Sequence, residues 1–173
     1  MEIISSFKGK YHFLSNFWSG NPFNVNSVNG VIVYKTNEHF YQAHKTLYTK
    51  EFNFVLDASS PGEAKKRGRK VTVRKDWDEV KLKVMEEGLR KKFSCHYLIT
   101  KLVCTYPLQL IEGNIWGDRF WGVCKGTGDN HLGKLLMKIR GEHIFKNRPE
   151  MFDWGFEIEI KSKDNENEGH DDK

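Results

Sequence analysis

The sequence predicts a single α+β domain that is rich in helix and carries a small sheet. Three observations lead to this fold class. Helix start signals followed by apolar residues at helical spacing recur through the middle of the chain, whereas strand-like runs are few and lie towards its two ends. The 173 residues suffice for one domain with a core of its own. No internal repeat or low-complexity linker divides them.

The N-terminal third is expected to consist mainly of loops and strands. Residues 13–18 are rich in aromatic side chains and lie among Gly and Asn residues that favour loops. Asn29-Gly30 is a dipeptide typical of a hairpin turn. The β-branched residues at positions 31–33 predict a strand over residues 31–34, directly after that turn.

Helices are expected to fill the middle of the chain. Thr36 or Asn37 is a suitable N-cap for a helix over about residues 38–49. Ser60, followed by Pro61 and then Glu63, has the pattern of a capping box. The remaining helices are expected over residues 61–68, from Asp76 to beyond Leu89, over 97–105 and over 130–144. Two apolar stripes are expected to face the core, Leu82, Met85, Leu89 and Phe93 in one helix and Leu132, Leu135, Leu136 and Ile139 in another.

The C-terminal end is expected to hold one more strand and a tail. Phe156, Ile158 and Ile160 alternate with acidic residues, which is the period of a half-buried strand. Residues 162–173 are charged and lack apolar anchors, so we expect them to be disordered. The domain is therefore expected to cover residues 1–161.

The composition favours an anionic ligand. The net charge is +5, and the acidic tail makes the rest of the chain more basic still. Three cysteines without CxxC spacing, and histidines without ligand spacing, predict neither disulfides nor a metal site. No membrane span or signal peptide is expected, and no cofactor is implied. A cytoplasmic location is the default expectation, and the oligomeric state stays open.

A glycine-rich segment is the most informative part of the sequence. Asp118 precedes Trp121 by three residues, and the glycines Gly126 and Gly128 then lead into a helix at Asn130. Glycines permit close approach of backbone N–H groups to a ligand, and a helix N-terminus favours negative charge. The pattern predicts a pocket with an acid, a stacking wall and a phosphate cradle completed by Gly133. A loop that merely joins two packed elements is the alternative.

A polar stripe on the first helix is the second candidate. Glu38, Gln42 and Lys45 fall at i, i+4 and i+7, so they share one face of a helix. They would line a pocket, or they would form an ordinary solvated face. A partly buried lysine can form a Schiff base with a sugar aldehyde. Arg69, in a basic cluster, could grip phosphate, and Trp77 could stack on a base, although surface and core roles are the alternatives.

At this point the chain resembles the YbiA-like, or NADAR, family of N-glycosidases that act on ribosyl nucleotides and ADP-ribose conjugates. The resemblance spans most of residues 3–145. Its marks, in chain order, are Phe13-Leu14-Ser15-Asn16-Phe17, Glu38-His39-Phe40-Tyr41-Gln42-Ala43-His44-Lys45, Ser60-Pro61, Gly68-Arg69, Asp76-Trp77-Asp78-Glu79, Asp118-Arg119-Phe120-Trp121-Gly122 and the stretch from Gly126 to Arg140. The order and spacing of these blocks make the match specific. Asp129 departs from the family pattern, because a basic residue is common there.

The resemblance implies hydrolysis of the C1′–N bond of a ribose. The substrate would be either ADP-ribose on a nucleobase, including guanine in DNA, or a phosphoribosylamino-pyrimidine intermediate of riboflavin synthesis. Glu38, Lys45 and Asp118 are the implied catalytic residues. The implied substrate-binding residues are Asn16, Phe17, Gln42, Arg69, Trp77, Trp121, Gly126, Gly128, Asn130 and Gly133. A non-catalytic ADP-ribose or nucleotide-binding module is the main alternative, and a nucleic-acid-binding protein ranks below it.

Overall fold

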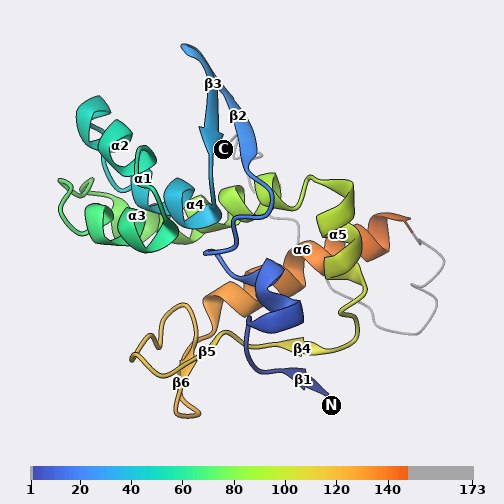
Figure 1. The fold of residues 1–173 in the computed structure, drawn as a ribbon. Coiled ribbons are helices and arrows are strands. Elements are labelled where there is room, and N and C mark those ends of the chain that lie inside the picture. Colours follow the sequence, from blue (N-terminus) through green and yellow to red (C-terminus); the bar gives the residue numbers. More distant parts are fainter. Residues whose placement is uncertain (1, 148–173) are drawn as a thin grey trace, which may run out of the picture.

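Helices dominate the architecture, as the sequence predicts for an α+β domain. The computed structural model describes residues 2–147, and the expected C-terminal strand and tail lie outside this range. Figure 1 shows α4 and α6 crossing the middle of the molecule, with α1, α2 and α3 grouped on one side and α5 on the other. The helices are the 3-10 helix η1 (Gly9–Leu14), α1 (Asn37–Ala43), α2 (Thr49–Leu56), α3 (Pro61–Gly68), α4 (Trp77–Lys92), α5 (His96–Val103) and α6 (His131–Asn147). Among the described residues, no helix is both long and apolar enough to cross a bilayer.

The strands form three separate two-stranded pairs instead of one sheet. Strand β1 (Ile3–Ile4) runs parallel to β4 (Gln109–Leu110), and β5 (Gly113–Asn114) runs parallel to β6 (Val123–Cys124). The pair β1–β4 joins the N-terminus to a segment more than 100 residues later, and β5–β6 brackets the loop that holds Asp118. These short pairs position loops, and the β1–β4 pair also contributes Ile4 and Leu110 to the core.

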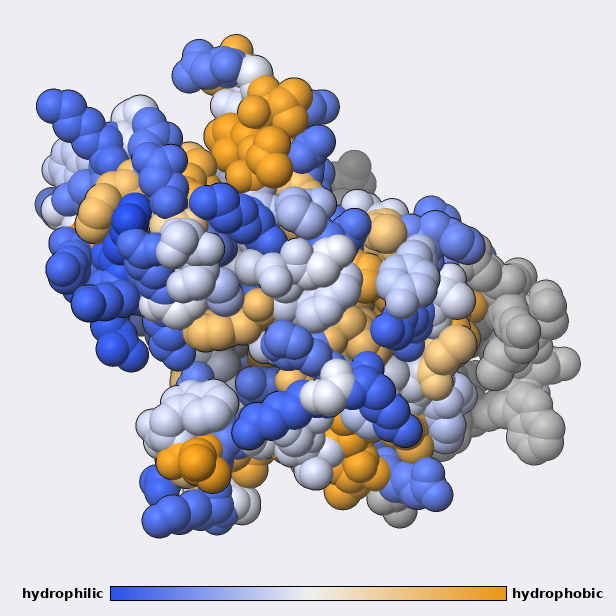
Figure 2. Space-filling view, viewed as in Figure 1, coloured by the Kyte–Doolittle hydropathy of each residue, from blue (hydrophilic) through white to orange (hydrophobic). Residues whose placement is uncertain are grey.

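The predicted hairpin is present. Strand β2 (Phe23–Ser27) pairs antiparallel with β3 (Gly30–Tyr34), and Gly30 has a φ of 116°, which suits glycine. Phe23 and Tyr34 anchor its base in the core, with ring centroids 5.6 Å apart. The hairpin projects from the body, and Figure 2 shows an apolar patch along it, below its tip. Val28, Val31 and Val33 are all more than half exposed.

The helix expected over residues 38–49 is wrong in its length, because the chain turns after Ala43. The carbonyl of Lys45 accepts the N–H of Arg74 at 2.7 Å, so it is not available to continue the helix. The Thr46 hydroxyl accepts the N–H of Tyr48 and donates to Glu51, which starts α2 as a separate helix. Lys45 consequently lies just beyond α1 and not on its third turn.

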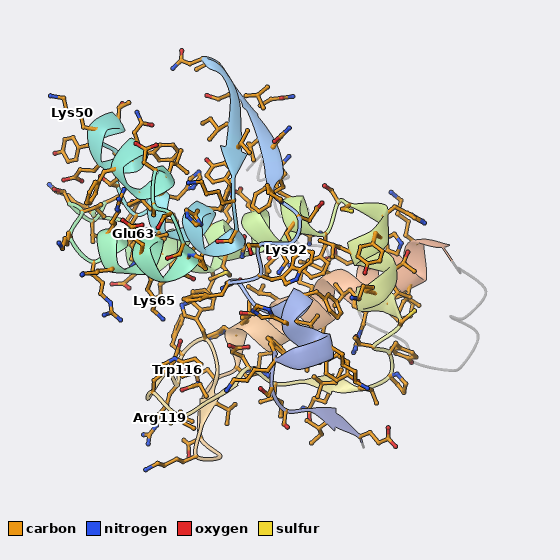
Figure 3. All side chains as sticks on the ribbon, in the orientation of Figure 1. Lys50, Glu63, Lys65, Lys92, Trp116 and Arg119 are labelled. Carbon is orange, nitrogen blue, oxygen red and sulfur yellow. The ribbon has the colours of Figure 1, made fainter. Side chains whose placement is uncertain are left out.

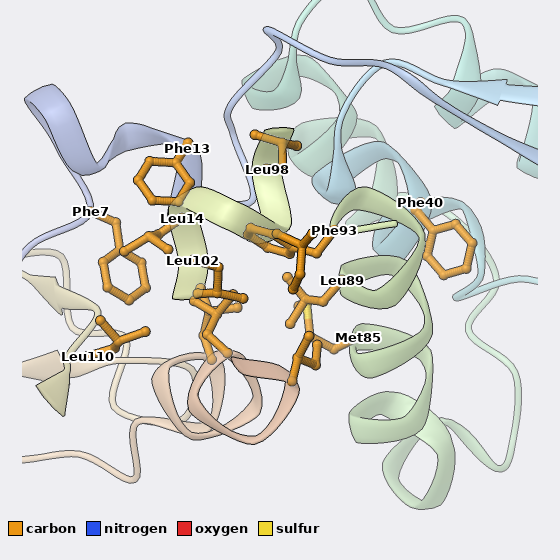
Figure 4. Packing of buried hydrophobic residues seen from close by; sticks show 14 of the residues in the cluster. Phe7, Phe13, Leu14, Phe40, Met85, Leu89, Phe93, Leu98, Leu102 and Leu110 are labelled. Carbon is orange, nitrogen blue, oxygen red and sulfur yellow. The ribbon is translucent and has the colours of Figure 1, made fainter. Parts of the chain in front are cut away.

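The core lies between α4, α5, α6 and the N-terminal segment. Figure 4 shows Met85 and Leu89 of α4 facing Leu102 of α5, with Phe13 and Leu14 of η1 on the far side of Leu102, and all of these belong to one buried cluster. Three of the four stripe positions on α4 are confirmed, but Leu82 is 37% exposed. The buried face of α4 is centred on Met85 and Lys92, so Leu82 falls towards one edge of it. Of the α6 stripe, Leu132, Leu136 and Ile139 are buried, and Leu135 packs against the cluster.

Candidate functional site

A cavity of about 680 Å³ lies where α1 and α3 face the N-terminal segment and the β5–β6 loop. Figure 3 labels Lys65 on α3 and Trp116 on the loop, which stand on opposite sides of it. Its lining includes eight of the residues that the sequence singles out: Asn16, Phe17, Glu38, Gln42, Lys45, Arg69, Asp118 and Trp121. The fold thus brings together segments more than 100 residues apart.

Glu38 is the most enclosed acid of the cavity. It lies in the first turn of α1, which Thr36 caps by accepting the N–H of His39, and its own N–H donates to the carbonyl of Asn16 at 3.0 Å. The side chain is 5% exposed, and Gln42 Nε2 donates to its Oε1 at 2.7 Å. Burial raises the pKa of Glu38, whereas the Gln42 bond and the charges of Lys65 and Lys45 act in the opposite direction. Glu38 and Gln42 therefore form a buried, hydrogen-bonded dyad, and the polar stripe of α1 is not a solvated face.

Lys45 approaches the cavity from the turn after α1. Burial is the largest cause that lowers the pKa of Lys45, and the carboxyl of Glu38 opposes it. Its Nζ lies 5.7 Å from the ring centroid of Tyr41 and 5.9 Å from that of Trp77. Trp77 does not line the cavity, because it packs on Tyr41 at 5.0 Å between centroids. Trp77 therefore supports Tyr41 and lies beside Lys45, and its position outside the cavity lining does not favour the expected base-stacking role.

Asp118 and Trp121 form part of the opposite wall. The N–H of Asp118 donates to Asn114 Oδ1 at 3.1 Å, and Asp118 Oδ1 accepts the N–H of Trp121 at 2.9 Å. The Trp121 ring meets Tyr41 edge to face at 5.3 Å. The three-residue spacing thus lets the Asp118 carboxylate close a turn by accepting the N–H of Trp121. This turn holds the Trp121 ring beside Tyr41 of α1.

Asn16 and Phe17 line the cavity from the N-terminal segment. Asn16 Nδ2 lies 3.3 Å from the sulfur of Met85, and Asn16 Oδ1 accepts from Asn37 Nδ2 at 2.8 Å. The amide of Asn16 is thus engaged inside the protein and orders the loop. Phe17 presents its ring to the cavity, with Lys65 Nζ 5.8 Å from its centroid.

The expected phosphate cradle is not part of the cavity. None of Gly126, Gly128, Asn130 and Gly133 lines it. A Cβ on Gly128 would come within 2.1 Å of the carbonyl of Gly122, and one on Gly133 within 2.2 Å of the carbonyl of Leu110. Gly126 has a φ of 79°, which a turn requires. In the structure these glycines serve packing and chain reversal, and Asp129 does not line the cavity either.

Asn130, directly before α6, has a structural task in place of the expected contact with substrate. Its Oδ1 accepts the N–H of Glu112 at 3.0 Å, and its Nδ2 donates to the carbonyl of Leu110 at 2.8 Å. Its own backbone has a φ of 54°. Asn130 therefore clamps the β4–β5 segment onto the start of α6, so the amide is not free for a ligand.

The cavity instead acquires cations that sequence reasoning missed. Lys8 and Lys65 line it together with Arg69, and among the described residues none of these three has an ion pair. Lys65 lies on the helix whose capping signal was recognised, one turn before Arg69, so helical spacing could have indicated it. No local sequence pattern indicates a role for Lys8. The exposed Trp116 adds an aromatic rim.

Glu112 and Lys92 are the second missed feature. Burial raises the pKa of Glu112 to about 7, and burial lowers the pKa of Lys92 to about 7. Lys92 is 1% exposed, and its Nζ donates to the carbonyl of Ser15 at 2.7 Å. Glu112 lines the cavity. The cavity thus contains three carboxyl groups in different environments, those of Glu38, Glu112 and Asp118. Within residues 2–147, no group of three His, Cys, Asp or Glu side chains has the arrangement of a metal site.

Such a cavity suits the chemistry of a ribose carrying a phosphate. Differently placed carboxyls can stabilise positive charge on a sugar and move protons, while unpaired cations attract a phosphate. Tyr41, Trp116 and Trp121 supply aromatic surfaces for a base.

Comparisons with known proteins show the family to which the chain belongs. A family model described as the NADAR domain matches residues 5–143. An N-glycosidase of Nostoc punctiforme is 39% identical over 113 residues, covering 62% of this chain and 72% of that protein. The N-glycosidase YbiA of Escherichia coli is 40% identical over 109 residues, covering 61% and 68%.

Two further matches concern a plant protein and a solved structure. A maize protein named riboflavin biosynthesis protein PYRR, chloroplastic, is 36% identical over 121 residues, 62% of this chain but 19% of the plant protein. The solution structure of Escherichia coli YbiA superposes with a TM-score of 0.73 and 33% identity, covering 91% of each chain. By the family model and by this shared fold, the chain belongs to the NADAR domain family.

Proposed function

We propose that this protein hydrolyses the C1′–N bond of a ribosyl nucleotide. The observation that carries the proposal is the buried Glu38 carboxyl, held by Gln42 in a cavity whose rim bears unpaired cations. Membership of the family supports the reaction class, since relatives of similar length bear the name N-glycosidase. The chain is accordingly a hydrolase of N-glycosyl bonds, and its substrate is the part that we propose.

Two substrate classes fit the cavity. One is a phosphoribosylamino-pyrimidine intermediate of riboflavin synthesis, which the name of the maize relative supports. The other is ADP-ribose attached to a nucleobase, including guanine in DNA. Both offer an anion for Lys8, Lys65 and Arg69 and a base for the aromatic walls.

Each cavity residue then has a proposed role. Glu38 stabilises the oxocarbenium-like transition state and activates water. Lys45 either contacts a hydroxyl or phosphate, or captures the opened sugar at C1′ as a Schiff base, to which its lowered pKa is suited. Asp118 holds the Trp121 turn and faces the ribose, and Trp121 stacks on the base. The phosphate lies against Lys65 and Arg69, in place of the glycine segment.

Product analysis tests the proposal. The protein is incubated with ADP-ribosylated guanosine, ADP-ribosylated DNA and the riboflavin-pathway ribotides, and the products are identified by mass spectrometry. From at least one substrate we expect either free ADP-ribose with unmodified guanosine or DNA, or a ribose phosphate with the free aminopyrimidine. Binding without any turnover would favour the rival reading, a non-catalytic nucleotide-binding module.

Two variants and a trapping reaction assign the roles. Glu38→Gln should lower the rate by roughly 10²–10⁴, while Glu79→Gln, an exposed acid outside the cavity, should leave it unchanged. Circular dichroism of both variants establishes that they fold. Borohydride with substrate should give an adduct on Lys45 if the covalent route operates, and absence of the adduct removes that route. Near-normal hydrolysis by Glu38→Gln would refute its assignment.

A further inference from the structure

Glu112 stands in the cavity on a rigid stretch of backbone. Its N–H donates to Asn130 Oδ1 at 3.0 Å, and its carbonyl accepts the N–H of Val123 at 2.9 Å. Gly122 packs directly over it, because a Cβ at that position would lie 2.2 Å from the Glu112 carbonyl oxygen and 3.1 Å from its Cγ. The backbone of Glu112 is therefore fixed, and its side chain has little freedom to turn away from the cavity.

The carboxyl of Glu112 lacks the donor that Glu38 has. Its Oε2 is enclosed, and no described residue makes a hydrogen bond to it. A buried carboxylate oxygen without a donor is unfavourable, whereas a protonated carboxyl becomes a donor itself. Gln42 Nε2 satisfies Glu38 and stabilises its charged form. Burial raises the pKa of both acids, but a hydrogen-bond donor opposes that rise at Glu38 only, so Glu112 is the better suited of the two to act as an acid.

The charged groups around Glu112 come from four parts of the chain. Asp118 raises its pKa, while Lys92 of α4, Lys65 of α3 and Lys8 before η1 lower it. Burial outweighs these cations, so the pKa rises to about 7. Lys92 shifts towards its neutral form as well, so it does not supply a full opposing charge at neutral pH.

We propose that Glu112 is a further catalytic residue, the proton donor to the departing base. As the C1′–N bond breaks, its electron pair goes to the base nitrogen, which takes the proton of the Glu112 carboxyl. Water then bonds to C1′ and gives a proton to the Glu38 carboxylate. Glu112 ends as a carboxylate and Glu38 as an acid, and exchange of one proton with solvent restores both.

This role rests on the proposed function, and the pH dependence of kcat/KM tests it. The wild type, Glu112→Gln and Glu112→Asp are assayed on the hydrolysed substrate between pH 5 and 9, with Glu79→Gln as the matched surface control and thermal melting to establish folding. A required acid must be protonated, so wild-type kcat/KM should fall as the pH rises through about 7. Glu112→Gln should lose roughly 10²–10⁴ at pH 6 and show no such fall, while Glu112→Asp retains part of the rate and the fall.

Three outcomes would overturn parts of the reasoning. Activity of Glu112→Gln within threefold of the wild type would exclude the donor role and leave the N-glycosidase proposal intact. A fall that moves to lower pH in Glu112→Gln, instead of disappearing, would assign it to Lys92, whose pKa Glu112 raises. A wild-type protein that hydrolyses no substrate of the panel would overturn the proposed function and the donor role with it.

Discussion

A methyl group added at Gly68 of α3 should disturb the hydrogen-bonded dyad of Glu38 and Gln42 on α1. Gly68 is the last residue of α3, which packs on α1. In Gly68→Ala, the new Cβ would lie 2.1 Å from Gln42 Oε1 and 2.8 Å from its Cβ. Gln42 must then move, and its hydrogen bond to Glu38 is strained or lost.

The magnitude follows from two opposing effects. Overpacking of a buried site costs about 1–3 kcal/mol, and alanine in place of a helical glycine returns up to about 1 kcal/mol. We expect a net loss of about 1–2 kcal/mol in the free energy of unfolding, or about 2–8 °C in Tm for a chain of this length. In a Gln42→Gly background both of these contacts are absent, so Gly68→Ala should be neutral or stabilising by up to about 1 kcal/mol.

Urea unfolding of the double-mutant cycle measures this coupling, and kcat/KM measures its effect on the site. Gly62→Ala, in the same helix, is the matched control, since the nearest atom to its new Cβ is 4.0 Å away. It should not destabilise the protein. If Gly68→Ala lowered stability equally with and without Gln42, the contact between the two residues would not be the cause.

Three further predictions concern the cavity and its supports. The double variant Lys65→Met/Arg69→Met should have a KM at least tenfold higher, because these cations would bind the substrate phosphate. The salt dependence of KM should also weaken, which steady-state kinetics at several salt concentrations can establish. Gly133→Ala should lower stability by about 1–3 kcal/mol through its contact with the Leu110 carbonyl, measured by urea unfolding. Asp118→Asn removes a charge that raises the pKa of Glu112, so the fall in kcat/KM with rising pH should begin at lower pH.

Local signals predicted much of the helical framework. Ser60 does cap α3, accepting the N–H of Glu63, because a capping pattern is a property of four adjacent residues. The carboxylate of Glu63, however, accepts from Ser59 and not from Ser60. The break after Ala43 depends on a hydrogen bond from Arg74, some 30 residues away, which no local pattern reveals. Strand pairing of β1 with β4 is equally non-local.

The same distinction separates the predicted from the missed parts of the site. Glu38, Gln42 and Lys45 share one short segment, so their proximity follows from helical spacing. Glu112 and Lys92 acquire their perturbed pKa values from burial against residues of other segments. In the sequence, each is an ordinary charged residue, Lys92 within a run of basic residues at the end of α4. Their chemistry exists only once the fold has removed them from water.

The glycine-rich segment has a packing role in the structure that its sequence pattern does not reveal. Gly122 and Gly133 exclude side chains where the loop and α6 press on the backbone of Glu112 and Leu110, and Asn130 ties that backbone in place. The glycines thus help to hold an acid in place, and we expect no direct phosphate contact from Gly126, Gly128 or Gly133, since none of them lines the cavity. Changes in this segment should accordingly alter the pH profile and the stability of the protein before they alter its affinity for a phosphate.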